Sequence, residues 1–510
     1  MNFADPFPGY SFLLRAIVYG VVPAFTIMQF VRYRRALHVF QLEGYKRRRF
    51  LEWCRRHPAR ARFLTAAPAK KPLVMTGRAW RILVTATALT PFVVLIPAGV
   101  AHLNFGGWPA DVATWLVVTV GVFVATPRMV VAADVMMTPV QMAINARYRS
   151  SARARLAAVN PLVVGITGSY GKTSTKFAIE RLIGPPGSAL ATPGSFNTPL
   201  GVCRTINEHL EPRHRFFVVE MGAYGEGEIA ELMRFVRPTI GVLTAIGPVH
   251  LERFGSMEAI RRGKYEVVRE LSPDGVAVVN SDDPEVRALA DATDHVRVVR
   301  AGIDPAGAPD VTAEDVEVHS RGTRFTIVDT RSGDRARVDT RLLGRHSIGH
   351  VLAAVAVGLE CGRSLADIAG AIPQLQPVEH RLQLIEGEGG VIVIDDAYNS
   401  NPAGAAAALE VLRGMPARKR VVVTPGIIEL GERAAEENER FGRTAGEIAD
   451  YVIVVATLNR DALVAGAKTG GRAEVIAVDT LSEATTRLAG IVAPGDVVLF
   501  ENDLPDQYEG

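Results

Sequence analysis

Hydrophobic and polar residues are distributed differently in the first third of the chain and in the remainder. Within residues 1–160 the apolar residues form long uncharged runs at 16–31, at 82–101 and, more weakly, at 112–126. The first two approach the roughly 20 residues that a helix needs to cross the apolar core of a bilayer. The third is shorter and ends at Pro127. We therefore expect two to three transmembrane helices in this membrane segment.

A strongly basic loop separates the first two apolar runs. Residues 31–81 contain fifteen lysines and arginines and only two glutamates. Because loops rich in Lys and Arg stay on the cytoplasmic side, we expect a multi-pass protein of the inner cell membrane with its remaining domains in the cytoplasm. Clustered basic side chains attract anionic headgroups, so membrane lipids are an expected partner. The alternatives are buried core helices or, for the first run, a signal peptide, although arginines rather than a small-residue cleavage site follow that run.

After Asn160 short apolar runs of strand length alternate with helical patterns. Val- and Ile-rich runs such as PLVVGIT at 161–167 and FFVVEMG at 216–222 are typical of strands buried on both faces of a parallel sheet. The segment 311–341 instead alternates polar and apolar residues, as antiparallel strands do, and predicts a second sheet. A connector and a smaller βαβ unit complete the chain. The predicted class is therefore α/β.

A chain of 510 residues is long enough for several domains, and these patterns predict three. The membrane segment occupies residues 1–160. A central ATP-binding domain with a P-loop and a parallel sheet occupies residues 161–376. A smaller, Rossmann-like C-terminal domain occupies residues 377–510.

Composition narrows the function classes. The formal net charge is only +3, so the chain as a whole does not have the charge of a nucleic-acid-binding protein. The three cysteines, Cys54, Cys203 and Cys361, lack the spacing of a zinc site or a redox pair. No feature of the sequence indicates an oligomeric state.

A glycine-rich segment, GITGSYGKTS at 165–174, lies between the first predicted strand of the central domain and a helical pattern. In such loops backbone N–H groups and the helix N-terminus bind phosphate, a lysine reaches the outer phosphates and a hydroxyl binds Mg²⁺. Its spacing is G-x-x-G-x-x-G-K-T, because Ile166 occupies the first glycine position of the commoner pattern. The candidate ATP-binding residues are Gly168, Ser169, Gly171, Lys172, Thr173 and Ser174, with Thr173 also a candidate Mg²⁺ ligand.

Nine further motifs follow this loop along the chain. They are TPGSFNTPLG at 192–201, VVEMGAYGEGEI at 218–229, IGPVHLERFGS at 246–256, GKYEVV at 263–268, VNSDD at 279–283, GRH at 344–346, EHRL at 379–382, DDAYNSNP at 395–402 and PGIIELG at 425–431. In type and order they resemble the Mur ligases, which add amino acids to cell-wall precursors. The last two are most similar to the D-alanyl-D-alanine-adding, MurF-type branch of that family.

The resemblance implies an ATP-dependent, ADP-forming acid–amino-acid ligase of peptidoglycan synthesis with ATP and Mg²⁺ as cofactors. ATP would phosphorylate a muramyl-peptide or similar carboxylate, and an amino-acid or dipeptide amine would attack the acyl phosphate. Phosphoryl transfer depends mainly on positioning and charge neutralisation, which suits a lysine, a metal ion and further cations. The alternatives are a membrane polyglutamate-synthase-type ligase of the same superfamily and a transport-coupled P-loop ATPase.

The resemblance also implies roles for residues outside the loop. Glu220 and His250 would bind Mg²⁺, and Lys264 would be carbamylated, which gives it oxygen atoms suited to that ion. Arg381 would reach the γ-phosphate. The expected catalytic residues are therefore Lys172, Lys264, His250 and Arg381, and the expected further nucleotide contacts are Asn280, His346, Arg381, Asp396 and Asn399.

Two features depart from the family pattern. Ser347 stands where the family usually has an asparagine, and a second such position lies near His350, so the nucleotide contacts there remain open. In addition, residues 1–160 take the place of the soluble domain that holds the UDP-sugar in the family.

Overall fold

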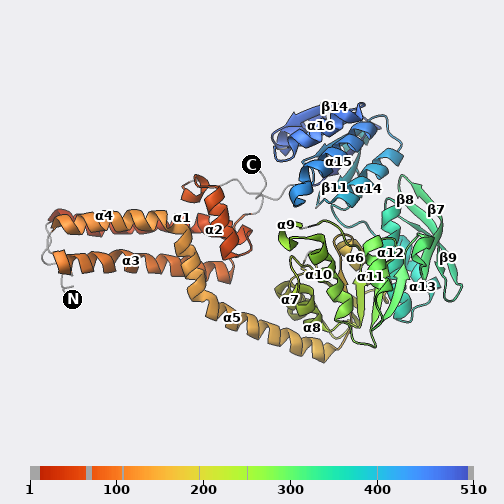
Figure 1. Ribbon diagram of the computed structural model, residues 1–510, viewed down its shortest axis with the longest axis horizontal. Coiled ribbons are helices and arrows are strands. Elements are labelled where there is room, and N and C mark those ends of the chain that lie inside the picture. Colours follow the sequence, from red (N-terminus) through yellow and green to blue (C-terminus); the bar gives the residue numbers. More distant parts are fainter. Residues whose placement is uncertain are drawn as a thin grey trace. The chain divides into compact units, whose positions relative to one another are not determined.

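A computed structural model of the chain describes residues 12–503 except 65–71, 106–107, Ser195, His250, Asn399 and Ala456. The chain divides into two compact units, one within Met1–Arg147 and one within Tyr148–Leu504. Helix α5 (Thr126–Val159) contains the boundary between them. Figure 1 shows helices in the first unit, coloured red to orange, and two sheets with their helices in the second.

The first unit is built from α1 (Phe12–Leu42), α2 (Arg47–Arg56), α3 (Gly77–Phe105), α4 (Trp108–Val124) and the start of α5. Side chains of α1, α2, α3 and α5 share one hydrophobic core, in which Phe40 and Phe50 are fully buried. Beside this core the Asp134 carboxylate of α5 accepts hydrogen bonds from Arg47 (2.7 Å) and Arg78 (2.9 Å). This acidic side chain therefore connects α5 to α2 and α3.

The three uncharged runs of the sequence lie in α1, α3 and α4, the third extending to the start of α5. Among the described residues, one helix, α5, is long and apolar enough to cross a membrane, and 17% of its apolar window is buried. The lengths and compositions of the described helices thus do not support the prediction of two to three transmembrane helices.

In the described part of the second unit, the larger sheet has nine strands in the order β2-β3-β1-β4-β5-β6-β7-β8-β9. Strands β1 to β6 run parallel. They are β1 (Leu162–Thr167), β2 (Ala189–Ala191), β3 (Phe216–Glu220), β4 (Ile240–Leu243), β5 (Val276–Asn280) and β6 (Arg297–Ala301). Helices cover both faces, which explains why these strands are apolar without alternation.

The two faces of this sheet have separate cores. One is formed with α6 (Lys172–Leu182), α12 (Arg345–Glu360) and α13 (Leu365–Ala371). The other is formed with α7 (Pro199–His209), α8 (Glu228–Val236), α10 (Met257–Arg269), α11 (Pro284–Asp291) and the end of α5. The short helix α9 (Leu251–Phe254) packs against α10. Because the helices cover the two faces of the sheet, a ligand site can form at the carboxyl ends of β1 and β3, where ligands usually bind in such sheets.

The antiparallel strands predicted at 311–341 exist, but they do not form a second sheet. They are β7 (Val311–His319), β8 (Gly322–Asp329) and β9 (Arg335–Thr340), and they extend the nine-stranded sheet. The connection is a parallel pairing of Ala301 in β6 with Val311 in β7. Alternating polar and apolar residues indicate that one face of a strand is buried. They do not indicate with which neighbouring strand or sheet it pairs.

The second sheet lies in the C-terminal part, drawn in blue in Figure 1, and has the order β10-β11-β15-β12-β13-β14. Its strands are β10 (Gln383–Glu386), β11 (Ile392–Asp396), β12 (Arg420–Thr424), β13 (Tyr451–Val455), β14 (Glu474–Val478) and β15 (Val497–Glu501). All pairings are parallel except that of β10 with β11. The core on one face includes α14 (Pro402–Gly414), α15 (Ala434–Ile448) and α16 (Arg460–Gly470), and that on the other includes α17 (Leu481–Ala489). Both sheets belong to one compact unit, so the predicted domain limits at residues 160 and 376 stay predictions.

Candidate active site

The glycine-rich loop between β1 and α6 has a backbone that only glycine fits at two positions. Gly168 has φ 152°, and a Cβ atom there would lie 2.0 Å from the Thr244 hydroxyl oxygen. Gly171 has φ 80° and precedes the first turn of α6; a Cβ atom there would lie 2.5 Å from Cε1 of His350. The loop therefore packs closely against its neighbours and presents the N-terminus of α6 as an anion-binding end.

Side chains of the loop fix its shape. Lys172 Nζ donates to the carbonyl oxygens of Gly168 (2.8 Å) and Ser169 (3.2 Å). The Ser169 hydroxyl donates to the Gly247 carbonyl (3.0 Å) and accepts from the Gly247 N–H (2.9 Å). Burial lowers the pKa of Lys172, an effect that Glu220 opposes. A phosphate would provide the anionic partner that this lysine favours.

Glu220 ends strand β3, which pairs with β1, and is 2% exposed. Its Oε2 accepts hydrogen bonds from the Thr173 hydroxyl and from Lys176 Nζ, both at 3.0 Å, and Oε1 accepts from Asn197 (3.2 Å). Burial opposes ionisation of Glu220, but Lys176 and Lys172 lower the pKa of its carboxyl below the usual value. The structure thus brings the two candidate Mg²⁺ ligands Thr173 and Glu220 together.

The oxygen atoms of these two side chains fit Mg²⁺, which takes one or two protein oxygens together with phosphate oxygens and water. Among the described residues, no group of three or more His, Cys, Asp or Glu side chains is placed to hold a metal ion by itself. His250, the other expected ligand, lies outside the described residues, as does the expected nucleotide contact Asn399.

Lys176 has a role that sequence reasoning missed. It is fully buried and donates to the Gly194 carbonyl (2.6 Å) as well as to Glu220. A lysine on an amphipathic helix normally suggests an exposed side chain. Its signal in the sequence is its spacing, one turn after Lys172, which places both lysines on one side of α6.

Lys264 lies on α10 and is 3% exposed. Its Nζ donates to the Ala223 carbonyl (3.3 Å) and lies 5.4 Å from the centre of the Phe254 ring. Burial, with a smaller contribution from Lys172, lowers the pKa of this amine to about 7. A neutral amine reacts with carbon dioxide, so the surroundings of Lys264 suit the predicted carbamylation.

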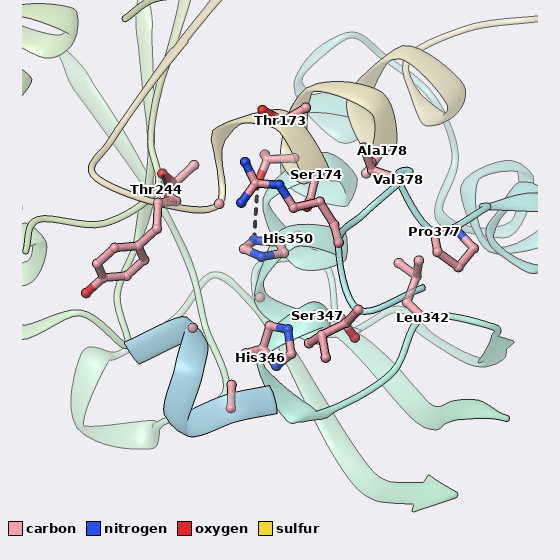
Figure 2. A pocket seen from close by; sticks show the side chains of 18 of the residues that line it. Thr173, Ser174, Ala178, Thr244, Leu342, His346, Ser347, His350, Pro377 and Val378 are labelled. Atoms are coloured by element: carbon pink, nitrogen blue, oxygen red, sulfur yellow. Dashed lines mark hydrogen bonds between the residues drawn. The ribbon is translucent and has the colours of Figure 1, made fainter. Parts of the chain in front are cut away.

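A pocket of about 1330 Å³ lies beside the glycine-rich loop at 165–174, which we call the phosphate loop. Residues of the nine-stranded and of the six-stranded sheet regions line it. Figure 2 shows Thr173 and Ser174 of α6 above His350, with His346 and Ser347 below it and Thr244 on the side opposite Pro377 and Val378. The predicted nucleotide-site residues that line this pocket are Gly171, Thr173, Ser174, Asn280, His346, Arg381 and Asp396. Gly168, Ser169, Lys172, Glu220 and Lys264 are not among the residues that line it.

The start of α12 contains the two positions that depart from the family pattern. The Ser347 hydroxyl donates to the Gly344 carbonyl (2.7 Å) and so bonds to the helix's own first turn. His350 Nδ1 lies 3.3 Å from the Thr175 hydroxyl, so this ring lies between α12 and α6. His346, one turn earlier, has its ring centre 6.1 Å from that of His350. Both imidazoles and Ser347 line the pocket.

Arg381 and Asp396 come from the connector and from the carboxyl end of β11. The guanidinium carbon of Arg381 lies 4.5 Å from the centre of the Tyr398 ring. The Asp396 carboxylate accepts a hydrogen bond from the Leu382 N–H (3.1 Å), and burial raises its pKa to about 6. Asn280, which also lines the pocket, donates to the Thr244 carbonyl (2.9 Å). The structure therefore places these three candidates in one pocket, and their contacts with nucleotide stay predictions.

Comparison with known proteins agrees with this arrangement. Residues 166–358 match the Mur ligase middle domain, and residues 380–501 match the domain described as Mur ligase, glutamate ligase domain. The chain is 36% identical over 368 residues to the UDP-N-acetylmuramoyl-tripeptide--D-alanyl-D-alanine ligase of Mycobacterium tuberculosis (strain ATCC 25618 / H37Rv), covering 69% of this chain and 70% of that protein. The chain belongs to the Mur ligase family.

Other Mur ligases are similar over the same region. A relative of the same name from Escherichia coli (strain K12) is 33% identical over 283 residues, 56% of this chain and 62% of that protein. MurF from Acinetobacter baumannii superposes with a TM-score of 0.63 at 28% identity, covering 71% of this chain and 77% of that one. MurF ligase from Thermotoga maritima in complex with ADP superposes with a TM-score of 0.62 at 27% identity, covering 70% and 80%.

Membership in the Mur ligase family confirms three predictions made from the sequence. They are the α/β fold with its central and C-terminal domains, the ATP-dependent ligase class and the relation to the D-alanyl-D-alanine-adding branch. The roles of individual residues are not tested by these similarities, and they stay predictions supported by the geometry above.

Proposed function

We propose that this Mur ligase joins D-alanyl-D-alanine to the terminal carboxylate of a muramyl tripeptide, with ATP converted to ADP and phosphate. The observation that carries the proposal is the pocket, which combines the phosphate loop, the connector arginine and the start of DDAYNSNP. Relatives that are 36% identical across these segments are named for this reaction.

The site residues fit the chemistry of such a ligase. A carboxylate oxygen attacks the γ-phosphorus and ADP leaves; the amine nitrogen then attacks the acyl carbon, and phosphate leaves as the C–N bond forms. Lys172 and Arg381 supply positive charge where the phosphoryl oxygens gain negative charge. Mg²⁺, held by Thr173 and Glu220, would neutralise further phosphate charge. Enclosure of the pocket by the C-terminal domain would protect the acyl phosphate from water.

The test is to supply the purified full chain with ATP, Mg²⁺ and a panel of UDP-linked and lipid-linked muramyl peptides, each with D-alanyl-D-alanine, glutamate or another amine. Phosphate release and product mass are followed together. We expect a product heavier by one dipeptide only with a muramyl tripeptide and D-alanyl-D-alanine. Turnover with glutamate alone would favour the polyglutamate-synthase-type ligase, and full phosphate release without any acceptor would favour a transport-coupled ATPase.

We further propose that the first unit attaches the ligase to the inner membrane, with the catalytic domains in the cytoplasm and the substrate at the membrane. Large apolar side chains on α3 and α4 support this proposal: Phe92, Ile96, Leu116 and Val117 are each between 61% and 71% exposed. Extended apolar surface of this kind is uncommon in water and is suited to acyl chains. Helix α2 contributes the exposed arginines that would face anionic lipid headgroups.

Membrane attachment is tested by washing membranes that contain the full chain with alkaline carbonate. We expect the protein to stay in the pellet, and release into the supernatant would reject the proposal. The orientation is tested with Ala59→Cys in a Cys54→Ser background, since Ala59 is exposed in the basic loop. A membrane-impermeant maleimide should label this cysteine only after the inner membrane has been permeabilised.

A further inference from the structure

Arg381 is flanked by two residues with a left-handed backbone. His380 has φ 58° and Leu382 has φ 44°. Residues other than glycine seldom adopt this conformation, and a bulky side chain such as leucine does so rarely. Such a backbone persists only where surrounding contacts hold it, and it is often found at functional sites.

Two consecutive aspartates at the carboxyl end of β11 hold this part of the connector. Asp395 Oδ2 lies 2.7 Å from His380 Nδ1, and Asp396 Oδ1 accepts from the Leu382 N–H at 3.1 Å. Asp395 is itself oriented, because its Oδ1 accepts from the Ala397 N–H (3.1 Å). The residues on both sides of Arg381 are thus attached to the same strand end.

The attachment continues into regular structure after Arg381. Strand β10 begins one residue after Leu382, and its first residue, Gln383, pairs with Asp395 in the antiparallel register. Before the arginine, its own N–H donates to the Val378 carbonyl (3.0 Å) in a turn. The connector backbone is therefore fixed from 378 to 383, and Arg381 lines the pocket that also contains Gly171 and Thr173.

We propose that His380 and Asp395 form a clamp that holds the connector in its left-handed conformation and thereby positions Arg381 for the γ-phosphate of ATP. The inference rests on the proposed function, which supplies the phosphate. His380 and Asp395 are positioning residues, since they act through Arg381. A single hydrogen bond from a half-exposed side chain normally contributes little to stability, so a purely structural role predicts a small effect of removing this one.

The test uses two substitutions of His380 that separate the hydrogen bond from the backbone requirement. Asparagine tolerates the left-handed region and carries an N–H near the position of Nδ1, so His380→Asn should keep the clamp. Glycine adopts the same backbone without cost but has no side chain, so His380→Gly should release it. Arg381→Ala removes the residue that the clamp would position.

Dissociation constants of the full chain with Mg²⁺ are measured for ADP and for a non-hydrolysable ATP analogue that retains the γ-phosphate. We expect His380→Gly to weaken binding of the analogue by about tenfold, as for loss of a hydrogen bond to a charged group, and to leave ADP binding unchanged. His380→Asn should stay within about twofold of the original protein. In the Arg381→Ala background, His380→Gly should have no further effect.

Three results would overturn the clamp. The first is an unchanged ratio of analogue affinity to ADP affinity in His380→Gly. The second is a loss of analogue affinity on His380→Gly that is the same in the original chain and in the Arg381→Ala background. The third is an unchanged ratio of analogue affinity to ADP affinity in Arg381→Ala. Failure of the proposed function is distinguishable, because the unmodified chain would then bind neither nucleotide or would form no ligated product with any acceptor.

Discussion

Lys176 Nζ lies 3.0 Å from Glu220 Oε2, and both side chains are almost completely buried, at 0% and 2% exposure. The lysine comes from the phosphate helix α6 and the glutamate from the end of β3, so the ion pair fixes the distance between these two elements. The Thr173 hydroxyl bonds to the same carboxylate oxygen. A single buried carboxylate therefore joins the phosphate loop to the strand beside it.

Breaking this pair from either side should destabilise the protein. Lys176→Met would leave the Glu220 carboxylate buried beside Thr173 without its nearest cation, which costs about 3–5 kcal/mol for a buried pair. Glu220→Gln would leave the lysine without its anion. The double variant should be more stable than either single variant, because no unpaired charge remains. Chemical denaturation measures this, and a double variant whose loss equals the sum of the two single losses would contradict the coupling.

Lys172→Ala should abolish turnover and leave the fold intact. In the described structure Lys172 donates to carbonyl oxygens of its own loop, and Glu220, whose pKa it also lowers, keeps its ion pair with Lys176 when Lys172 is removed. Its charge would be missing where the phosphoryl oxygens gain negative charge, and we expect a loss in kcat of at least about 10²-fold. Lys468→Ala, on the exposed surface of α16, is the matched control. Near-normal turnover by Lys172→Ala would remove this lysine from the catalytic residues.

The phosphate loop and the parallel sheet were predictable because their signals are local. PLVVGIT followed by glycines and Lys-Thr places a strand, a turn and a helix within 22 residues, and the structure has β1, the loop and α6 there. The pairing of β6 with β7 was not predictable, because the contact between Ala301 and Val311 depends on how the whole sheet folds.

Contacts between residues distant in sequence explain what remained hidden. Lys176 and Glu220 are 44 positions apart, and the spacing from Lys172 places Lys176 on the same side of α6 without indicating that it is buried. His380 and Asp395 are 15 positions apart in two different motifs, and a sequence carries no signal for a left-handed histidine. Only the pairing of β10 with β11 and the hydrogen bond between these two side chains bring the two motifs into contact.

Carbon dioxide should be required for full activity. Lys264 has a pKa lowered to about 7 by burial, so its neutral fraction increases as the pH rises from 6 to 8. Carbamylation joins this neutral amine to carbon dioxide with release of a proton, so more carbamate should form at pH 8 than at pH 6. Removal of carbon dioxide should therefore lower turnover reversibly, with the larger loss at pH 8. A ¹³C signal from ¹³C-labelled carbon dioxide bound to the protein should be present in the original chain and absent from Lys264→Ala.

Small added carboxylates should partly restore turnover to Lys264→Ala, because they can supply the missing oxygen atoms. The same additions to Lys172→Ala should restore nothing. Full activity of Lys264→Ala in buffer free of carbon dioxide would show that this lysine has no part in the reaction.

Stability at alkaline pH should depend on Glu501, the last residue of β15. This side chain is fully buried; its Oε1 accepts from the Ser400 hydroxyl and its Oε2 from the Thr424 hydroxyl (3.0 Å). Asp396, its register partner on β11, adds a second carboxylate beside it. Burial is the main cause that raises the pKa of Glu501 to about 8, against an ordinary value of 4.5.

The direction of the effect follows from these two values. Between pH 4.5 and about 8 the folded protein keeps Glu501 protonated while the unfolded chain ionises it, so the stabilising contribution is complete below pH 4.5 and is lost as the pH rises through about 8. Glutamine resembles the protonated carboxyl and does not titrate. Glu501→Gln should therefore have nearly the same Tm as the original chain at pH 5 and a higher Tm at pH 9. Glu410→Gln, an exposed glutamate on α14, should change Tm little at either pH. An equal loss of Tm at pH 5 and pH 9 in Glu501→Gln would instead mean that the carboxylate is ionised in the folded protein and needed by its two hydroxyl partners.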